Sequence, residues 1–479
     1  MAIQGRIKHV VVLMLENRSF DQIFGFREGV EGLSGNEFNV LNPSAGASGG
    51  NPKITVGQEA PFTINLGGGP DHNLATVNLQ LFGHDSNPVA GENPRNNGFA
   101  ASYQQQLLRF SSHPSTTDVR VVMQSFSSGS LPAIEALADN FCLFDHWFCE
   151  VPSSTDPNRL YMHAATSIGN ARNVFQKQFP NTRTIYNSIE DAGLTWATYD
   201  FDLNEVRTQF PGTHTNSQNF RRFNPRFADD VANNSLPNYS FIFPRFINSH
   251  GPQNDQHAPR DLRPGDQLIA QVYNTLRSNL DVWNAAAFIV TYDEHGGFFD
   301  HVPPPSDGVF NPDGINAEPV QSTHLFTPAF DFKRLGPRVP VLLASPWVKK
   351  GIVVSDRFQH TSVLATLKKM FGLSDFLTQR DRHANTFEHL FNELAAPRTD
   401  TPEQLPEVAI EEAAHVLDSV APSDAGELPL DDTQQEMMMG VLAITQSSSE
   451  TPTAVPTTQA AAAQFVQERL DSHFGPRAS

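Results

Sequence analysis

Five short apolar runs recur along this chain of 479 residues, and they limit its fold more than any other feature. They lie at 7–15, 194–199, 239–243, 285–292 and 339–345, and each has the length of a buried strand. Stretches with helical spacing lie between or after them, at 131–141, 265–278 and 360–371. This alternation predicts an α/β fold with a central, mostly parallel sheet sandwiched by helices.

Polar residues suited to metal or phosphate chemistry directly follow two of these runs. Glu16 and Asn17 follow the run at 7–15, and Asp293 and Glu294 follow the run at 285–292. Carboxylate and amide oxygens are ligands of hard cations. Ligands collect beyond the carboxyl ends of strands in open α/β sheets, so we expect both pairs at one sheet edge. The alternatives are a polar loop after the later run and a helix cap near Asn17.

The segment 291–305 continues with His295, Gly296, Gly297, Asp300 and His301. Histidines bind phosphate or carry protons, and glycines let backbone approach a bound group closely. His295 and His301 are therefore candidates for substrate binding. Alternatively, these histidines and Asp300 hold the loop in place without touching substrate.

Three hydroxyls, a carboxylate, an amide and an arginine share the stretch 153–159. A hydroxyl beside a cation loses its proton more easily, so Thr155 is a candidate nucleophile. Arg159 could bind a phosphoryl group through two parallel hydrogen bonds. Taken alone, however, the stretch favours a proline-containing turn.

Several histidines lie in polar loops. His72 and His257 could donate to a phosphate oxygen or protonate a leaving group. A single loop histidine is more often a surface residue, and that alternative applies to both. His214, His250 and His360 are weaker candidates, and His360 could simply begin its helix.

The formal net charge of −19 argues against a nucleic-acid partner, which would require a basic face. A phosphate substrate would be repelled at long range, so its site needs local positive charge from a metal, arginine or histidine. Cys142 and Cys149 are too few for a disulfide framework. They could bridge each other or remain inert thiols.

No apolar run approaches the ~20 residues of a membrane-spanning helix. The run at 10–15 is also shorter than the apolar region of a signal peptide. We expect either a cytoplasmic protein or one exported by a route that this sequence does not encode.

Composition divides the chain into a catalytic domain at 1–397 and an acidic extension at 398–479 that is rich in Pro, Thr and Ala. Glycine, asparagine and proline predict long loops with little regular structure between 25 and 112. Two helices are predicted in the extension, at 432–443 and 460–474. They either pack on the main domain or face a partner or membrane.

Four motifs, in this order, resemble those of the bacterial phospholipase C and acid phosphatase A family of phosphoesterases, which has fungal and plant members. The motifs are HVVVLMLENRSFD at 9–21, STDPNR at 154–159, NDQHAP at 254–259 and TYDEHGGFFDH at 291–301. GPRVP at 336–340 with SP at 345–346, and HTS at 360–362, look like further family signatures. The resemblance leaves the C-terminal extension outside.

The resemblance implies an alkaline phosphatase-like core with a hydroxyl nucleophile beside one divalent metal ion. Thr155 matches the nucleophile, and His72 and His257 match histidines that bind phosphate or serve the leaving group. Some relatives carry Ser at the nucleophile position or Asp-Asp in place of Asp-Glu, and both changes keep the chemistry. Further histidines of some relatives have no clear match, and His214 is a guess. The implied metal ligands are Glu16, Asn17, Thr155, Asp293 and Glu294.

We therefore expect a metal-dependent phosphoesterase that uses Ca, Mg, Mn or Zn. The favoured activity is that of a phospholipase C, which releases diacylglycerol and a phosphorylated head group and contacts the membrane peripherally. An acid phosphatase acting on phosphomonoesters is the first alternative. An alternative of another class is a non-catalytic partner-binding protein that acts through its acidic tail.

Overall fold

The structure is a computed structural model that describes residues 5–64, 69–109, 111, 114–247, 252–321, 326–408, 430, 432–446 and 454–475. Its centre is an eight-stranded sheet. From one edge to the other the strands are β13 (Ile352–Val354), β4 (Cys142–Phe144), β12 (Val341–Ala344), β9 (Ala286–Tyr292), β1 (His9–Leu15), β8 (Tyr239–Ile242), β6 (Trp196–Asp200) and β7 (Phe220–Arg222).

The predicted mostly parallel sheet is confirmed. β1 lies at its centre and pairs in parallel with β8 and β9. β12 is the exception, because it runs antiparallel to both of its neighbours, β9 and β4. The central strands are buried over nearly their whole length, as their continuous apolar sequence requires.

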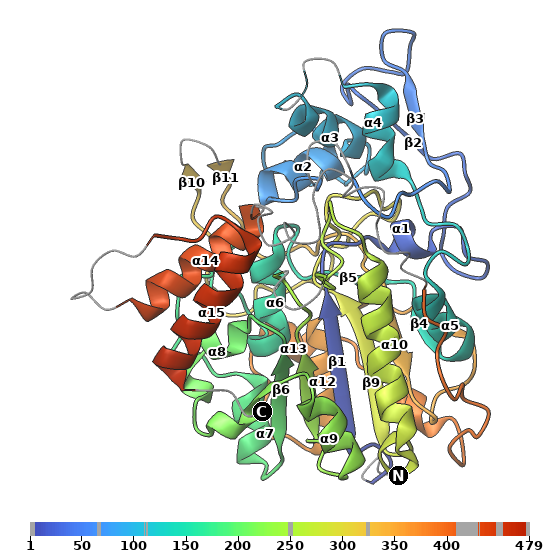
Figure 1. Ribbon diagram of the computed structural model, residues 1–479. Coiled ribbons are helices and arrows are strands. Elements are labelled where there is room, and N and C mark those ends of the chain that lie inside the picture. The colour runs from blue at the N-terminus through green and yellow to red at the C-terminus, as the bar shows by residue number, and fades with distance from the viewer. Residues whose placement is uncertain are drawn as a thin grey trace.

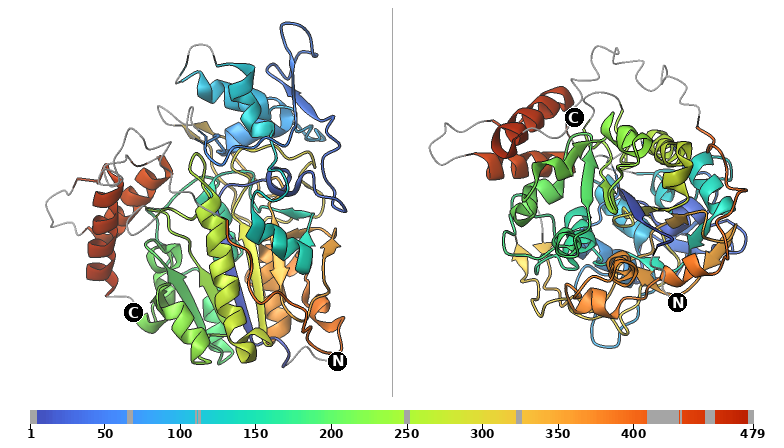
Figure 2. Two further views of the ribbon diagram at one scale, coloured as in Figure 1. Left: turned by 45° about the vertical axis from the view of Figure 1, so that its right-hand side comes forward. Right: turned by 90° about the horizontal axis from the view of Figure 1, so that it is seen from below.

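Helices cover both faces of the sheet (Figures 1 and 2). One layer is built around α10 (Arg263–Ser278), with α5 (Pro132–Asn140), α9 (Arg226–Ala232) and α11 (Leu280–Trp283) packed against it. The other layer contains α12 (Thr361–Phe371), α6 (Thr155–Ala164), α7 (Ile185–Asp191) and α13 (Gln379–His383). The predicted helices at 131–141, 265–278 and 360–371 agree with α5, α10 and α12 to within two residues.

A smaller group of elements lies above the carboxyl ends of the central strands (Figure 1). It contains the hairpin β2 (Phe38–Val40) and β3 (Lys53–Thr55) and the helices α2 (Leu74–Phe82), α3 (Phe99–Leu107) and α4 (Thr116–Arg120). Between 25 and 112 the long loops that were expected are therefore interrupted by this hairpin and by α2 and α3. Asparagine and glycine bound the helices here: the Asn73 side chain caps α2, and Gly83 ends it at a φ of 82°.

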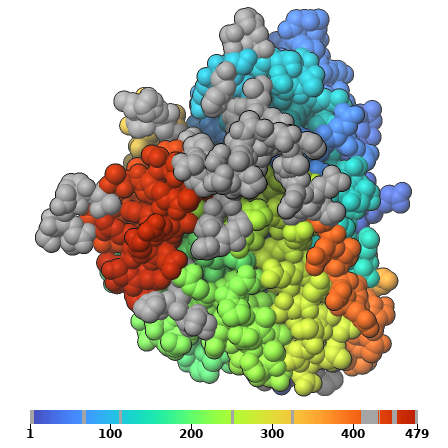
Figure 3. All heavy atoms as spheres, in the orientation of Figure 1, coloured from blue at the N-terminus to red at the C-terminus, as the bar shows by residue number. Residues whose placement is uncertain are grey.

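The C-terminal extension forms the two predicted helices, α14 (Asp432–Thr445) and α15 (Gln459–Phe474). They stand out as a red lobe beside the green part of the domain in Figure 3. Met437 and Met438 are buried, whereas Met439 is exposed. Gln434 donates to the carbonyl oxygen of Phe246 at 2.6 Å. These contacts agree with the expectation that the helices pack on the main domain.

The structure also bears on the two cysteines and on membrane-spanning helices. Cys142 and Cys149 are both buried and free, so they do not bridge each other. Among the described residues, no helix is long and apolar enough to cross a lipid bilayer.

Candidate active site

The carboxyl ends of β1 and β9 bring the two predicted acid pairs together. Because the strands pair in parallel, the residues that follow them emerge side by side. The backbone N–H of Asn17 donates to Asp293 Oδ1 at 3.0 Å. Glu16, Asn17, Asp293 and Glu294 are all buried. Burying so many polar groups together at the carboxyl ends of two strands costs free energy, which indicates a functional site.

A close backbone approach fixes this arrangement. Asn17 has a φ of 62°, in the left-handed region that asparagine tolerates, and Gly296 has a φ of 66°. A Cβ atom at position 296 would lie 2.2 Å from the carbonyl oxygen of Asn17. The backbone N–H of Gly296 also donates to Glu294 Oε2 at 2.8 Å. Glycine at this position therefore allows the two loops to touch and orients Glu294.

The two adjacent carboxylates differ in how far neighbouring groups compensate their charge. Burial, reinforced by the neighbouring Glu294 carboxylate, raises the pKa of Asp293 to about 7. Burial also acts to raise the pKa of Glu294, but the charge of His72 and a hydrogen bond from His295 lower it overall. Adjacent buried carboxylates are unfavourable without counter-charge. A bound cation would supply it.

Among the buried side-chain oxygens that have no hydrogen-bond partner within the described part of the chain, four belong to predicted metal ligands. They are Asn17 Oδ1, Thr155 Oγ1, Asp293 Oδ2 and Glu294 Oε1. Buried polar atoms are almost always paired, so these exceptions require an explanation. Amide, hydroxyl and carboxylate oxygens are the donor set of a hard divalent cation. These residues therefore fit the ion that the family resemblance implies.

Thr155 is the first residue of α6, so the stretch 153–159 opens a helix rather than forming a turn. Pro157 falls in the first helical turn, where its missing N–H costs no helical hydrogen bond. Thr155 and Arg159 are one turn apart and share a side of the helix. Arg159 Nη1 lies 3.9 Å from both Glu16 Oε1 and Asp293 Oδ2. Thr155 therefore lies on the same helix as Arg159, whose guanidinium pairs with the carboxylates of Glu16 and Asp293.

His72 lies beside these ligands. Its Nδ1 is 2.9 Å from the carbonyl oxygen of Pro70, which can only accept, so Nδ1 carries a proton. Its Nε2 is 3.3 Å from Asn17 Nδ2 and 3.8 Å from Glu294 Oε1. Burial acts to lower the pKa of His72, but the charges of Glu294 and Asp71 outweigh it and raise the pKa overall.

His257 lies next to His72, with 6.0 Å between the ring centroids. Its Nδ1 contacts the carbonyl oxygen of Ala258. The loop is tied to the end of β1, because the Glu16 N–H donates to the carbonyl oxygen of Asp255 at 2.8 Å. The structure therefore places both candidate loop histidines together at the site.

The two histidines of the segment 291–305 lie in different surroundings. His295 is fully buried, with Nδ1 3.2 Å from Glu294 Oε2 and Nε2 2.7 Å from Gln80 Oε1. His295 therefore contacts Glu294, a candidate metal ligand, from the side of the protein interior. His301 Nδ1 instead lies 2.7 Å from Asp21 Oδ2. A substrate-binding role remains a prediction for both residues.

Asp21, on the short helix α1 (Phe20–Phe24), belongs to a second polar cluster with Asp300 and His301. Their ligand atoms all lie within 4.8 Å of one another, so the cluster could hold a metal. However, Arg338 already binds both acids, with Nη2 2.7 Å from Asp21 Oδ1 and Nε 2.9 Å from Asp300 Oδ1. Because this buried arginine supplies the counter-charge, the cluster is better explained as a structural contact that holds the loop than as a metal site.

Glu205 and His163 did not stand out in the sequence. Arg159 Nε donates to Glu205 Oε1 at 2.7 Å, and His163 Nε2 lies 3.2 Å from the same oxygen. Glu205 begins α8 (Glu205–Gln209) beyond the carboxyl end of β6, as Asp293 follows β9. His163 is four residues after Arg159 on α6. The position of His163 could have been predicted by reading 153–159 as the start of a helix, and that of Glu205 by its place after the strand β6.

Of the weaker candidates, His360 contacts the backbone carbonyl oxygen of Asp293, whereas His214 lies away from the site. His214 Nε2 is 2.8 Å from the carbonyl oxygen of Arg207, and its ring contacts Phe474 of α15. It is therefore engaged with the C-terminal helices. His250 lies outside the described residues.

Comparisons with known proteins agree on one family. A model of the Phosphoesterase family matches residues 7–374. Non-specific phospholipase C1 of Arabidopsis thaliana is 40% identical over 429 residues, which cover 85% of this chain and 75% of the relative. Phospholipase C B of Mycobacterium tuberculosis is 31% identical over 433 residues, covering 83% and 80% of the two chains.

Similar solved structures are more distant. A protein of the alkaline phosphatase superfamily from Vibrio parahaemolyticus is 11% identical, covering 54% of this chain and 67% of its own, with a TM-score of 0.31. Murine ectonucleotide pyrophosphatase/phosphodiesterase 5 is 12% identical, covering 52% and 91%, with a TM-score of 0.32. On the sequence match, the chain belongs to the Phosphoesterase family and is a phosphoric ester hydrolase.

Proposed function

We propose that this protein is a metal-dependent phospholipase C that uses Thr155 as its nucleophile. The observation that carries the proposal is the set of buried ligand oxygens without a hydrogen-bond partner, which includes the Thr155 hydroxyl. Relatives named non-specific phospholipase C from a plant, 40% and 37% identical to this chain, support the choice of a phospholipid substrate.

A divalent ion would be bound by Glu16, Asn17, Thr155, Asp293 and Glu294, and its charge would favour the alkoxide form of the threonine. The Thr155 hydroxyl gives up its proton to solvent as Oγ forms a bond to phosphorus, while the bond from phosphorus to the glycerol oxygen breaks. His72 or His257 gives a proton to that oxygen, so diacylglycerol leaves. Water then hydrolyses the phosphothreonine and releases the phosphorylated head group.

Arg159 would bind the phosphoryl group. Its guanidinium is buried among carboxylates, and on α6 the residue is one helical turn from the nucleophile, so it would hold a phosphoryl oxygen during attack. Because the substrate resides in a bilayer, the protein must contact the membrane surface during turnover.

The test compares two substrates on one preparation with added Mn²⁺. With phosphatidylcholine we expect diacylglycerol and phosphocholine, formed faster than p-nitrophenol is released from its phosphate monoester. Faster turnover of the aryl phosphate would instead identify an acid phosphatase. Release of phosphatidic acid and choline would mean that a different bond is cleaved.

A further inference from the structure

Arg159 lies between two groups of carboxylates. On one side Nη1 is 3.9 Å from both Glu16 Oε1 and Asp293 Oδ2. On the other side Nε donates to Glu205 Oε1 at 2.7 Å. The contact with Glu205 is a short charge-assisted hydrogen bond, whereas the longer contacts are ion pairs without a hydrogen bond. The arginine is therefore held by Glu205 and kept away from the proposed metal ligands.

The Glu205 carboxylate is itself fixed in place. His163 Nε2 lies 3.2 Å from Glu205 Oε1, and the Tyr186 hydroxyl lies 3.0 Å from His163 Nδ1. All four side chains of this row are buried, and the Arg159 guanidinium also lies over the rings of Phe243 and Phe246. A row of this kind defines one position for the guanidinium.

A guanidinium and a divalent cation compete for the same carboxylates. If Arg159 moved towards Glu16 and Asp293, it would neutralise them and take hydrogen-bonding positions that the ion requires. The side chain is long enough to move in this way, because its two ion pairs are already at 3.9 Å. What prevents the movement is the stronger contact with Glu205.

We propose that Glu205 is a positioning residue that restrains Arg159 and so leaves Glu16 and Asp293 available to the metal ion. This inference rests on the metal site of the proposed function. Glu205 touches neither the ion nor the substrate in this account and acts only through Arg159.

The test is a double-mutant cycle on metal affinity, measured by calorimetric titration of the full chain with Mn²⁺ alone. Glu205→Gln keeps the shape but removes the charge, and we expect it to weaken Mn²⁺ binding by roughly 10- to 100-fold. Arg159→Gln removes the competing cation and should bind Mn²⁺ at least as tightly as the wild type. In the double variant the effect of Glu205→Gln should disappear, because there is no arginine to restrain.

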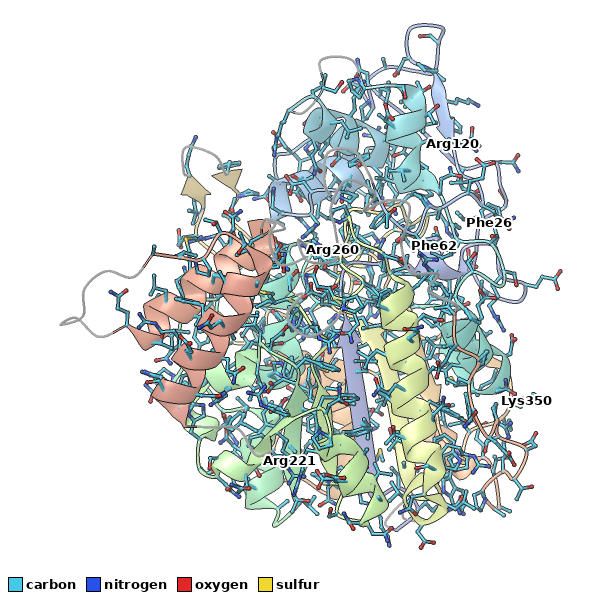
Figure 4. The ribbon with its side chains drawn as sticks, viewed as in Figure 1. Phe26, Phe62, Arg120, Arg221, Arg260 and Lys350 are labelled. Carbon is cyan, nitrogen blue, oxygen red and sulfur yellow. The ribbon has the colours of Figure 1, made fainter. Side chains whose placement is uncertain are left out.

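The matched control is Asp230→Asn. Asp230, which is buried, pairs with the partly buried Arg221 in another acid–arginine contact. Figure 4 shows Arg221 near the lower end of the molecule, well below Arg260, which is three residues from His257. This control should lose thermal stability but retain wild-type Mn²⁺ affinity. Melting curves of every variant show that the proteins compared are folded.

Three outcomes would contradict the inference. Wild-type Mn²⁺ affinity in folded Glu205→Gln protein would overturn the restraint of Arg159 but not the metal site. The same would follow if Glu205→Gln weakened Mn²⁺ binding equally in the wild-type and Arg159→Gln backgrounds. Absence of Mn²⁺ binding by the wild-type protein overturns the proposed metal site and the restraint together.

Discussion

His360 donates a hydrogen bond from Nε2 to the backbone carbonyl oxygen of Asp293, with 2.7 Å between the two atoms. The direction is fixed because Trp147 Nε1 donates to His360 Nδ1 at 3.3 Å, which leaves the proton of the neutral ring on Nε2. Burial lowers the pKa of His360 to about 4, so the ring stays neutral. A residue at the start of α12 thus holds the backbone of a proposed metal ligand.

The first prediction concerns this contact. His360→Leu removes the donor, so Asp293 loses its support and we expect roughly 10- to 100-fold weaker Mn²⁺ binding by calorimetry. His360→Gln restores an N–H donor and should recover part of the affinity. Wild-type affinity in folded His360→Leu protein would show that the hydrogen bond does not position Asp293.

The second prediction concerns Gly296. Gly296→Ala should abolish Mn²⁺ binding, because the new Cβ would lie 2.2 Å from the Asn17 carbonyl oxygen and push the two loops apart. Gly314→Ala is the matched control, since Gly314 has a φ of 80° but no atom within 4 Å of the added Cβ. The control should lose about 1–2 kcal/mol of unfolding free energy and keep its metal affinity. Equal metal affinity in both variants would contradict the prediction.

The third prediction concerns metal removal. EDTA should lower the melting temperature of the protein, because three buried carboxylates lose their counter-ion. A free ion concentration of 100 times the Kd stabilises the folded state by about 2.7 kcal/mol. In Asp293→Asn the EDTA effect should shrink sharply, because ion binding is weakened and the repulsion with Glu294 is relieved. Asp139→Asn, at an exposed acid, should respond to EDTA as the wild type does. A wild-type protein whose melting temperature ignores EDTA would argue against a bound ion.

The fourth prediction concerns the pH dependence of stability. Burial raises the pKa of Asp266 from 3.8 to about 6, although its carboxylate accepts hydrogen bonds from the Ala133 and Ile134 N–H groups. Its protonated form is therefore favoured in the folded state. The stability it contributes is fully present below pH 3.8 and is lost as the pH rises to about 6.

Asp266→Asn removes this titration. The wild type should lose stability relative to Asp266→Asn between pH 4 and 6, by up to roughly 1.4 kcal/mol per pH unit. Urea unfolding of both proteins at a series of pH values measures the difference. A constant difference across this range would show that Asp266 titrates normally.

Much of the site could be predicted because it depends on strand ends. Asp293 and Glu16 follow continuous apolar runs, and parallel pairing of those runs was enough to place them together. Glu205 also follows a strand, but no motif beside it in the sequence identified it as a residue of the site. Its proposed role arises from a contact with Arg159, 46 residues away in the chain, which only the packed helices create.

The loops were harder to predict for a different reason. Glycine and asparagine between 25 and 112 suggested loops, yet Asn73 and Gly83 bound a helix. Sequence spacing also could not show that His295 and His301, six residues apart, have different surroundings. The surroundings of His301 depend on Arg338, whose buried guanidinium binds both Asp21 and Asp300.

The central claim, that Thr155 is the nucleophile of a phospholipase C, is tested most directly by diacylglycerol release from phosphatidylcholine at saturating Mn²⁺. Thr155→Val keeps the side-chain shape without the hydroxyl, and we predict a fall in rate of at least about a thousandfold. Thr155→Ser keeps the hydroxyl and should retain much of the activity. Near-wild-type release by folded Thr155→Val protein would contradict the claim.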